Sequence, residues 1–246
     1  VRIGGLSGIY KSHDYQLSRF ERPPYDNSTM RSVYHYRNLE VYRLKCLSRR
    51  LDVMLSHDWP QGIEQYGNTR GLIRRKPFFE DEINSNSLGS PPAMELLQKL
   101  QPSYWFSAHL HVKFTATVRH VQPGSSASSS VNILIPSQAI RATAEKGDGK
   151  AQATETASPA ATQFVAPETI SACGDTPDLT DLMTQFLSLD KCLPRRQYLS
   201  VVHIPANDPA SDKLEYDLEW LAIIGQTHHL LAANGKHRVR PPDEPI

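Results

Sequence analysis

The chain has 246 residues, of which 39% are hydrophobic and 22% charged, and its 27 basic and 26 acidic residues leave a formal net charge of +1. This near-neutral balance argues against a strongly basic coat for nucleic acid, although a local basic patch is compatible with it. No run of about 18 apolar residues is present, so the sequence predicts no membrane span. The hydrophobic fraction is below the roughly 45–50% of an average globular chain, which indicates that part of the sequence lies outside a packed core.

The cysteine pattern and the first residues place two further bounds on the chain. Cys46, Cys173 and Cys192 are odd in number and far apart, which fits neither a disulfide framework nor a Cys-x-x-Cys zinc site and favours a reducing compartment. The sequence begins with Val1 rather than Met, and VRIGGLSGIY already resembles the interior of a strand. We therefore expect a fragment that is truncated at its N-terminus.

The first third of the chain predicts a strand, a loop and a helix. Residues 1–10 are typical of a glycine-bearing strand, and the polar, proline-containing stretch after them is typical of a loop. A helix is expected from about residue 28 to residue 47, because its apolar residues recur at helical spacing. Arg37 and Glu40 fall inside its apolar arc and are spaced to pair with each other. This favours a structural ion pair, with a substrate-facing role as the alternative.

The next segment predicts buried strands that end in polar motifs. Residues 51–60 form a nearly continuous apolar run, typical of a strand buried on both faces, that ends in Ser-His-Asp-Trp-Pro. A short helix is expected around 78–83, and a longer one begins at the prolines of 91–92. Residues 103–120 are aromatic and β-branched, which predicts two strands that meet at a tight turn near 108–112.

Composition changes after residue 120. From 121 to about 169 the chain is rich in Ser, Ala, Thr, Gln and Pro, and no aromatic residue occurs between Phe114 and Phe164. Such a stretch has too little apolar bulk to offset the entropy of ordering, so we interpret it as a linker. Beyond it we predict a helix over 177–189, a strand over 197–205 and an amphipathic helix over 214–231.

Three histidines stand at the ends of predicted strands. His57 closes one strand, while His109 and His111 close another and, at a spacing of two, would project to the same side of an extended backbone. A lone histidine at a strand end is more often structural. Two such segments together indicate a metal site, because strand ends in α/β folds collect ligand chemistry and imidazole is a common transition-metal ligand. Composition and spacing alone predict no function beyond this metal site.

The motifs that contain the three histidines resemble those of a known protein family. SHDWP (56–60), followed about fifty residues later by SAHLHVKF (107–114), resembles the C-terminal half of calcineurin-like metallophosphoesterases. Ala108 stands where that superfamily usually has Gly. An alanine at this position resembles the RNA lariat debranching enzymes instead. Further blocks resemble that family in order: GGLSGIYKSHDY, RSVYHYRNLE, LGSPPAMELL, FLSLDKCLPRR and LEYDLEWLAII. The last two blocks disfavour another metallophosphoesterase, such as a phosphoprotein phosphatase.

The resemblance implies an α/β fold with three parts. Residues 1–120 would be the C-terminal part of the catalytic domain, an αββα metallophosphoesterase sandwich. Residues 121–175 would be a disordered low-complexity linker, and residues 176–235 a small α/β C-terminal domain.

The resemblance also implies a metal-dependent phosphodiesterase. His57 and His109 would bind one divalent ion and His111 a second, the ions being Fe, Zn or Mn, with Asp58 orienting a ligand histidine from behind. The substrate would be the branched RNA of excised intron lariats, cleaved at its 2′–5′ phosphodiester bond in the nucleus during intron turnover in mRNA processing. No organic cofactor is implied.

Other motifs of the family do not occur in this sequence. The family brings a Cys-x-His pair, a bridging Asp, a loop that recognises the lariat, and an Asn-His-Glu motif whose His is the expected proton donor; the chain contains neither Cys-x-His nor Asn-His-Glu. We therefore expect no catalytic proton donor in this chain and no activity of the fragment alone. The alternative is a non-catalytic RNA- or protein-binding module derived from a metallophosphoesterase.

Weaker signals have two interpretations each. Ser12, His13 and Asp14 are adjacent and cannot form a hydrolase triad; they indicate a loop near the substrate or a turn-stabilising motif. Trp59, like Asp58, is expected to hold the His57 loop rather than contact RNA. The basic cluster of Lys191, Arg195 and Arg196 is expected to be solvated, with phosphate contact as the alternative.

Overall fold

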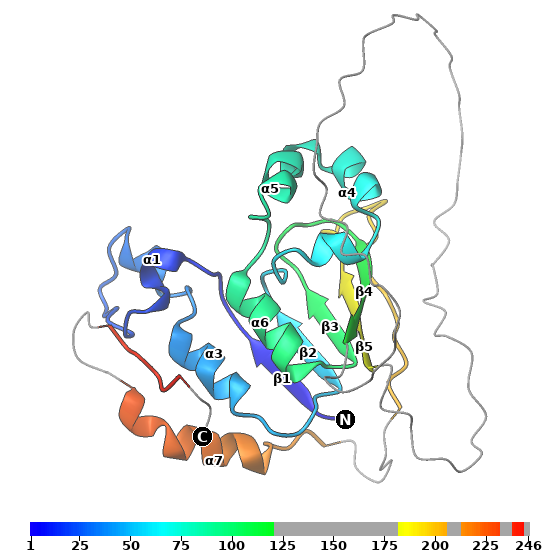
Figure 1. The fold of residues 1–246 in the computed structure, drawn as a ribbon. Helices are drawn as coiled ribbons and strands as arrows, with labels where there is room; N and C mark the ends of the chain where they lie inside the picture. Colours follow the sequence, from blue (N-terminus) through cyan, green and yellow to red (C-terminus); the bar gives the residue numbers. More distant parts are fainter. Residues whose placement is uncertain (121–181, 206–212, 232–237, 244–246) are drawn as a thin grey trace, which may run out of the picture.

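The structure is a computed structural model that describes residues 1–120, 182–205, 213–231 and 238–243 (Figure 1). The predicted linker, 121–175, lies outside these residues. None of the helices in the described ranges is long and apolar enough to cross a membrane. Of the three cysteines, Cys46 is a buried free thiol and Cys192 an exposed one, whereas Cys173 lies outside the described residues.

A five-stranded sheet in the order β1-β2-β3-β5-β4 forms the centre of the fold. The strands are β1 (Ile3–Leu6), β2 (Val53–Ser56), β3 (Tyr104–Ser107), β4 (Phe114–His120) and β5 (Leu182–Ser188). The first four in spatial order are parallel, and β4 pairs antiparallel with β5 at the edge. The carboxyl ends of β1, β2 and β3 therefore meet at one edge of the sheet, where ligand sites of α/β folds gather.

Helices connect the strands and cover one face of the sheet. The α-helices are α1 (Ser12–Tyr15), α2 (Thr29–Ser32), α3 (Asn38–Lys45), α4 (Thr69–Arg75), α5 (Glu80–Asn84), α6 (Pro91–Leu100) and α7 (Leu218–Gln226). Short 3-10 turns are η1 (Ile63–Tyr66), η2 (Pro77–Phe79) and η4 (His228–Leu230). Helices α3 and α6 contact each other and lie side by side over the sheet (Figure 1). Helix α6 begins where its prolines predicted, after Ser90, which accepts a hydrogen bond from the Ala93 amide as its N-cap.

The core lies between the sheet and these helices. Met54, Trp105 and Phe186 are register partners in three neighbouring strands, and each is fully buried. On the other face of the sheet, Ile3 and Leu55 are 55% and 44% exposed. One covered face and one exposed apolar face are what part of a two-sheet αββα sandwich presents, and the α/β fold class is thereby confirmed.

The prediction of a helix over 177–189 was wrong, because residues 182–188 form strand β5. Thr184, Phe186 and Ser188 alternate along one face and are fully buried, so the period of two describes the segment better than the helical period. The prediction that the strands of 103–120 meet as a hairpin was also wrong. Strand β5 lies between β3 and β4 and pairs with both.

Two further elements differ from the sequence prediction. The helix expected over 28–47 is two helices, because Tyr34 and Tyr36 pair through their backbones with Ile9 in the interval between α2 and α3. Residues 197–205 form no strand: Leu199 and Val201 are largely exposed, and an alternating pattern without a partner strand does not suffice. The short helix α5, helix α6 and a helix within 214–231 are confirmed.

The division at residues 120 and 176 stays a prediction. Strand β5 falls within the predicted C-terminal domain, yet it lies in the same sheet as the strands of residues 1–120. The two predicted parts therefore share one sheet among the described residues.

Candidate metal centre

The carboxyl ends of β2 and β3 are joined by hydroxyl groups. The side chains of Ser56 and Ser107 lie 2.8 Å apart, and both donate to the backbone carbonyl of Asp58, at 2.7 and 3.2 Å. The buried indole of Trp105 donates to both hydroxyl oxygens. This network fixes the turn that follows each strand, and those turns carry His57 and His109.

Two backbone-level contacts then fix the histidine segments to each other. The Ala108 amide donates to the His57 carbonyl at 3.1 Å, and the Trp59 indole Nε1 donates to the Ala108 carbonyl at 3.0 Å. Trp59 is 1% exposed and stacks on Phe114 with ring centroids 5.2 Å apart. The predicted structural role of Trp59 is confirmed.

His57, Asp58 and His109 come together at this edge of the sheet. The two imidazole rings lie 4.7 Å apart, centroid to centroid, at 67°. One donor atom from each of the three residues lies within 4.8 Å of the others. The Asp58 Oδ2 accepts the Tyr10 amide at 2.6 Å, which holds the carboxylate in place from the end of β1.

The remaining atoms of this cluster fit a bound cation. Asp58 Oδ1 lies 2.9 Å from His109 Nδ1, but the two are not aligned for a hydrogen bond, and both atoms are buried without a hydrogen-bond partner. Buried polar atoms of this kind call for a partner. Two imidazoles and a carboxylate are a donor set suited to a divalent transition metal, so the residues fit the predicted ion.

His111 does not join this group, and its backbone is not extended as predicted. His109 and His111 have φ angles of +58° and +50°, in the left-handed region that non-glycine residues seldom adopt. Such strain is concentrated at functional sites. His111 is nevertheless close enough to His57 and His109 to interact electrostatically with both.

The pKa directions favour neutral imidazoles. Burial lowers the pKa of His57, and the nearby His109 lowers it further against the opposing effect of Asp58. His111 is exposed, but the desolvation it retains lowers the pKa of its imidazole too, followed by the positive charges of Lys191 and Lys76. A neutral imidazole has the free nitrogen lone pair that metal binding requires.

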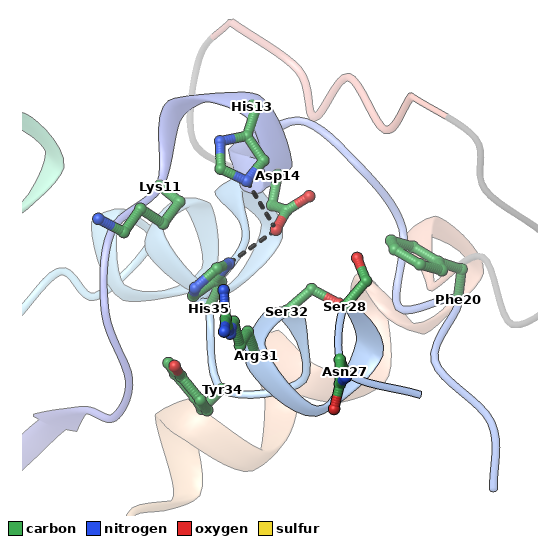
Figure 2. A pocket seen from close by; sticks show the side chains of 10 residues that line it. All are labelled: Lys11, His13, Asp14, Phe20, Asn27, Ser28, Arg31, Ser32, Tyr34 and His35. Carbon is green, nitrogen blue, oxygen red and sulfur yellow. Dashed lines mark hydrogen bonds and ion pairs between the residues drawn. The ribbon is translucent and has the colours of Figure 1, made fainter. Parts of the chain in front are cut away.

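A second polar cluster lies in a cavity of about 590 Å³ beside α1 and α2 (Figure 2). His13 and Asp14 lie on α1, and Asp14 contacts His35 from the segment that precedes α3. Ser12, His13 and Asp14 thus form no triad, as predicted. His35 was missed by the sequence analysis, because nothing in the local pattern links it to a residue 21 positions earlier.

Arg37 and Glu40 are structural, but they do not pair with each other through their side chains as predicted. The Arg37 guanidinium pairs with Glu21 at 2.5 Å, and both side chains are 2% exposed. Glu40 pairs with Arg19 at 3.1 Å, and its other oxygen accepts the Arg37 amide at 2.6 Å. The extended backbone of Arg37 at the N-cap turns its side chain away from Glu40 toward the loop that contains Glu21.

A largely parallel α/β sheet with histidines in the turns after two neighbouring strands has the features of the metallophosphoesterase class. Comparison with known proteins agrees with this class and narrows it. Residues 181–245 match the family "Lariat debranching enzyme, C-terminal domain". The chain is 42% identical over 236 residues to the lariat debranching enzyme of Homo sapiens, and 45% identical over 243 residues to that of Drosophila melanogaster.

These alignments cover 96% and 98% of the chain, but only 34% and 42% of the two relatives. The relative from Arabidopsis thaliana is 41% identical over 223 residues, 91% of the chain and 40% of its own length. The chain belongs to the lariat debranching enzyme family and spans about a third to two fifths of the length of these relatives.

Proposed function

We propose that the protein to which this chain belongs hydrolyses the 2′–5′ phosphodiester bond at the branch point of excised intron lariats. The proposal includes two divalent metal ions (Fe, Zn or Mn), branched lariat RNA as the substrate, and the nucleus as the location. The single observation that carries it is the cluster of His57, Asp58 and His109, in which two buried donor atoms have no hydrogen-bond partner. The names of the relatives supply the reaction.

In this proposal His57 and His109 hold one ion, and His111 contributes to the other. Asp58, which the sequence predicts to orient a ligand histidine, would instead offer its Oδ1 to the same ion, because this oxygen makes no hydrogen bond to His109. The Tyr10 amide holds the other carboxylate oxygen of Asp58. When bound, paired divalent ions lower the pKa of a water molecule and offset the charge that develops on the phosphoryl and leaving oxygens. The left-handed backbone at His109 and His111 directs these side chains away from the positions an extended strand would give them.

Positive charge near His111 suits a phosphate group. Lys76 and Lys191 act electrostatically on His111 from two parts of the chain, the end of α4 and the segment after β5. We assign these lysines to substrate phosphates, because lysine is a common phosphate-binding point charge and phosphate contacts fix the position of RNA. We assign the catalytic proton donor to no residue of this chain.

The test uses a synthetic RNA with a single 2′–5′ branch and the full-length protein. We expect cleavage at the branch, with a linear 3′–5′ RNA of the same sequence left intact. His109→Ala should lose at least about a hundredfold in rate, since it removes a ligand and its contact with Asp58, whereas the exposed His228→Ala should cleave at the parent rate. Tight binding of the branched RNA without cleavage would instead identify a non-catalytic binding module and overturn the proposal.

A further inference from the structure

The second cluster, formed by His13, Asp14 and His35, has the composition of a metal site. Asp14 Oδ2 lies 2.7 Å from His35 Nδ1 and 3.4 Å from His13 Nε2, and the three donor atoms all lie within 4.8 Å of one another (Figure 2). Asp14 and His35 are 4% and 6% exposed, whereas the His13 side chain is 70% exposed. Among the described residues, only this cluster and the one at His57 meet the same geometric criterion.

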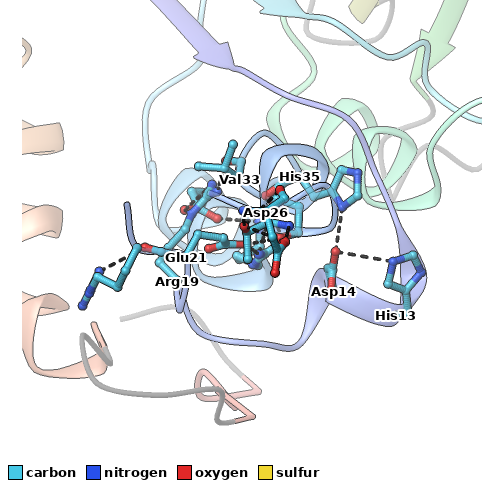
Figure 3. A network of polar contacts seen from close by, with 12 residues as sticks. His13, Asp14, Arg19, Glu21, Asp26, Val33 and His35 are labelled. Carbon is cyan, nitrogen blue, oxygen red and sulfur yellow. Dashed lines mark hydrogen bonds and ion pairs between the residues drawn. The ribbon is translucent and has the colours of Figure 1, made fainter. Parts of the chain in front are cut away.

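The fold holds these donors in place before any ligand arrives. Ile9 and His35 form an isolated parallel bridge, and Ile9 exchanges backbone hydrogen bonds with Tyr34 and Tyr36. This fixes His35 beside the chain that leads into α1. The first turn of α1 then places His13 and Asp14 over His35, with the two imidazole rings 6.0 Å apart at 84° (Figure 3).

Hydrogen bonds within the cluster involve Asp14 and His35 closely but leave the His13 nitrogen farther away. One oxygen, Asp14 Oδ2, faces two imidazole nitrogens; the nearer, on His35, makes a hydrogen bond of 2.7 Å, while the His13 nitrogen is at 3.4 Å. A cation between the three atoms would use all of them at once, with the His35 ring proton carried on Nε2 so that the Nδ1 lone pair is free for the ion. Two imidazoles and one carboxylate match zinc and cobalt better than the all-oxygen sites of magnesium or calcium.

The cluster also has room for the remaining ligand. It lies on the wall of the 590 Å³ cavity, which Asn27 and Ser28 line from the start of α2. Lys11 and Arg31 line the same cavity. Their positive charge opposes a bare cation, so it favours an anion as the fourth ligand beside the ion. Three protein ligands and an open position are typical of zinc sites other than purely structural ones.

We propose that His13, Asp14 and His35 form a separate binding site for a divalent transition-metal ion, of which Zn²⁺ is the natural candidate. The ion would link α1 to the segment before α3. The site stands on its own geometry, goes beyond the proposed hydrolysis, and does not depend on the ions assigned to His57, His109 and His111.

The test measures Co²⁺ bound to the purified protein by equilibrium dialysis and by visible absorption. We expect His13→Ala to bind about one ion fewer than the parent, while the double variant His57→Ala/His109→Ala retains that ion. The affinity of this site should fall more than about tenfold in His13→Ala, because losing even an indirect ligand contact costs that much. His13 is chosen because its side chain is largely exposed, so its replacement by alanine removes little packing from the folded protein. His228→Ala, also at an exposed histidine, is the matched control.

A second readout does not depend on counting ions. A ligand that binds only the folded state stabilises that state. Zn²⁺ should therefore raise the unfolding midpoint of His57→Ala/His109→Ala. It should not change the unfolding midpoint of the triple variant, which also carries His13→Ala. Equal cobalt content and affinity in the parent and His13→Ala would overturn the proposal. If the His57 site fails to bind metal, the parent still loses its ion on His13→Ala, so failure of the proposed function is distinguishable from failure of this site.

Discussion

Trp59 donates its indole hydrogen to the carbonyl of Ala108 at 3.0 Å, and Ala108 directly precedes His109 in the chain. In the opposite direction, the Ala108 amide donates to the carbonyl of His57. The turns after β2 and β3 are therefore bonded to each other twice through Ala108, once at the backbone of His57 and once at the side chain of Trp59. A displacement of one histidine segment must be transmitted to the other, and this explains why the geometry of the candidate metal centre depends on a buried tryptophan that is not a ligand.

Trp59→Phe tests this link. Phenylalanine keeps an aromatic ring against Phe114 but leaves the Ala108 carbonyl without its donor. We expect a loss of about 1–3 kcal/mol in the free energy of unfolding, measured by urea denaturation. Trp59→Leu should cost more, because it also removes the ring contact. A Trp59→Phe protein as stable as the parent would show that the indole bond contributes nothing.

The left-handed backbone at His111 makes a prediction about side-chain shape. Asparagine tolerates this region and a β-branched residue does not, so His111→Val should be about 1–2 kcal/mol less stable than His111→Asn. His111 is exposed, so loss of packing makes only a small contribution. Thermal or urea unfolding of the two variants checks this, and equal stabilities would contradict the observed backbone conformation.

Glu64 predicts a pH-dependent stability difference. Its side chain is fully buried, Oε2 has no hydrogen-bond partner, and burial raises the pKa of its carboxyl despite opposing hydrogen bonds from its own backbone and Gln65. Above the unfolded-state value of about 4.5, the unfolded chain releases this proton first, so the contribution of Glu64 to stability falls as pH rises. Glu64→Gln should therefore be more stable than the parent at pH 7.

The comparison of Glu64→Gln with the parent is made by urea denaturation between pH 4.5 and pH 8. The advantage of the variant should shrink toward the acid end, where the unfolded chain of the parent also begins to take up the proton. A constant difference across this range would rule out titration of Glu64 as the cause.

The buried pair of Arg37 and Glu21 predicts strong non-additivity. Arg37→Met leaves the buried Glu21 carboxylate with its Ser32 hydrogen bond but without the guanidinium, at an expected cost of about 3–5 kcal/mol. Replacing both residues, as in Glu21→Leu/Arg37→Met, should recover much of that loss. Urea unfolding of the two single variants and the double variant measures the coupling, and additive effects would contradict a direct pair.

Local sequence patterns predicted the elements whose neighbours are close in the chain. The apolar run before His57 and the two prolines in the first turn of α6 fix β2 and α6 by short-range rules. Strand β5 could not be recognised in the same way. The apolar positions of 177–189 also fit a helical period. Only the position between β3 and β4, whose residues lie about 60 to 80 positions earlier in the chain, selects the strand.

The candidate sites show the same limit. Histidines at strand ends indicated that His57 and His109 would meet, because parallel strands bring their carboxyl ends together. The contact of Asp14 with His35 and the pairing of Arg37 with Glu21 join loops without a periodic pattern, so spacing gave no signal for either. The left-handed φ of His109 and His111 was equally hidden, since it follows from the bonded turns and not from residue preference.

Metal-dependent debranching at the site that contains His57 and His109 is tested by single-turnover cleavage of a synthetic 2′–5′ branched RNA. The full-length protein is measured before chelation, after chelation and after Mn²⁺ is restored. We expect chelation to abolish cleavage, Mn²⁺ to restore it, and His57→Ala to stay inactive at the same Mn²⁺ concentration. Undiminished cleavage by the metal-free protein, or by His57→Ala, would show that the reaction does not depend on a metal held at this site.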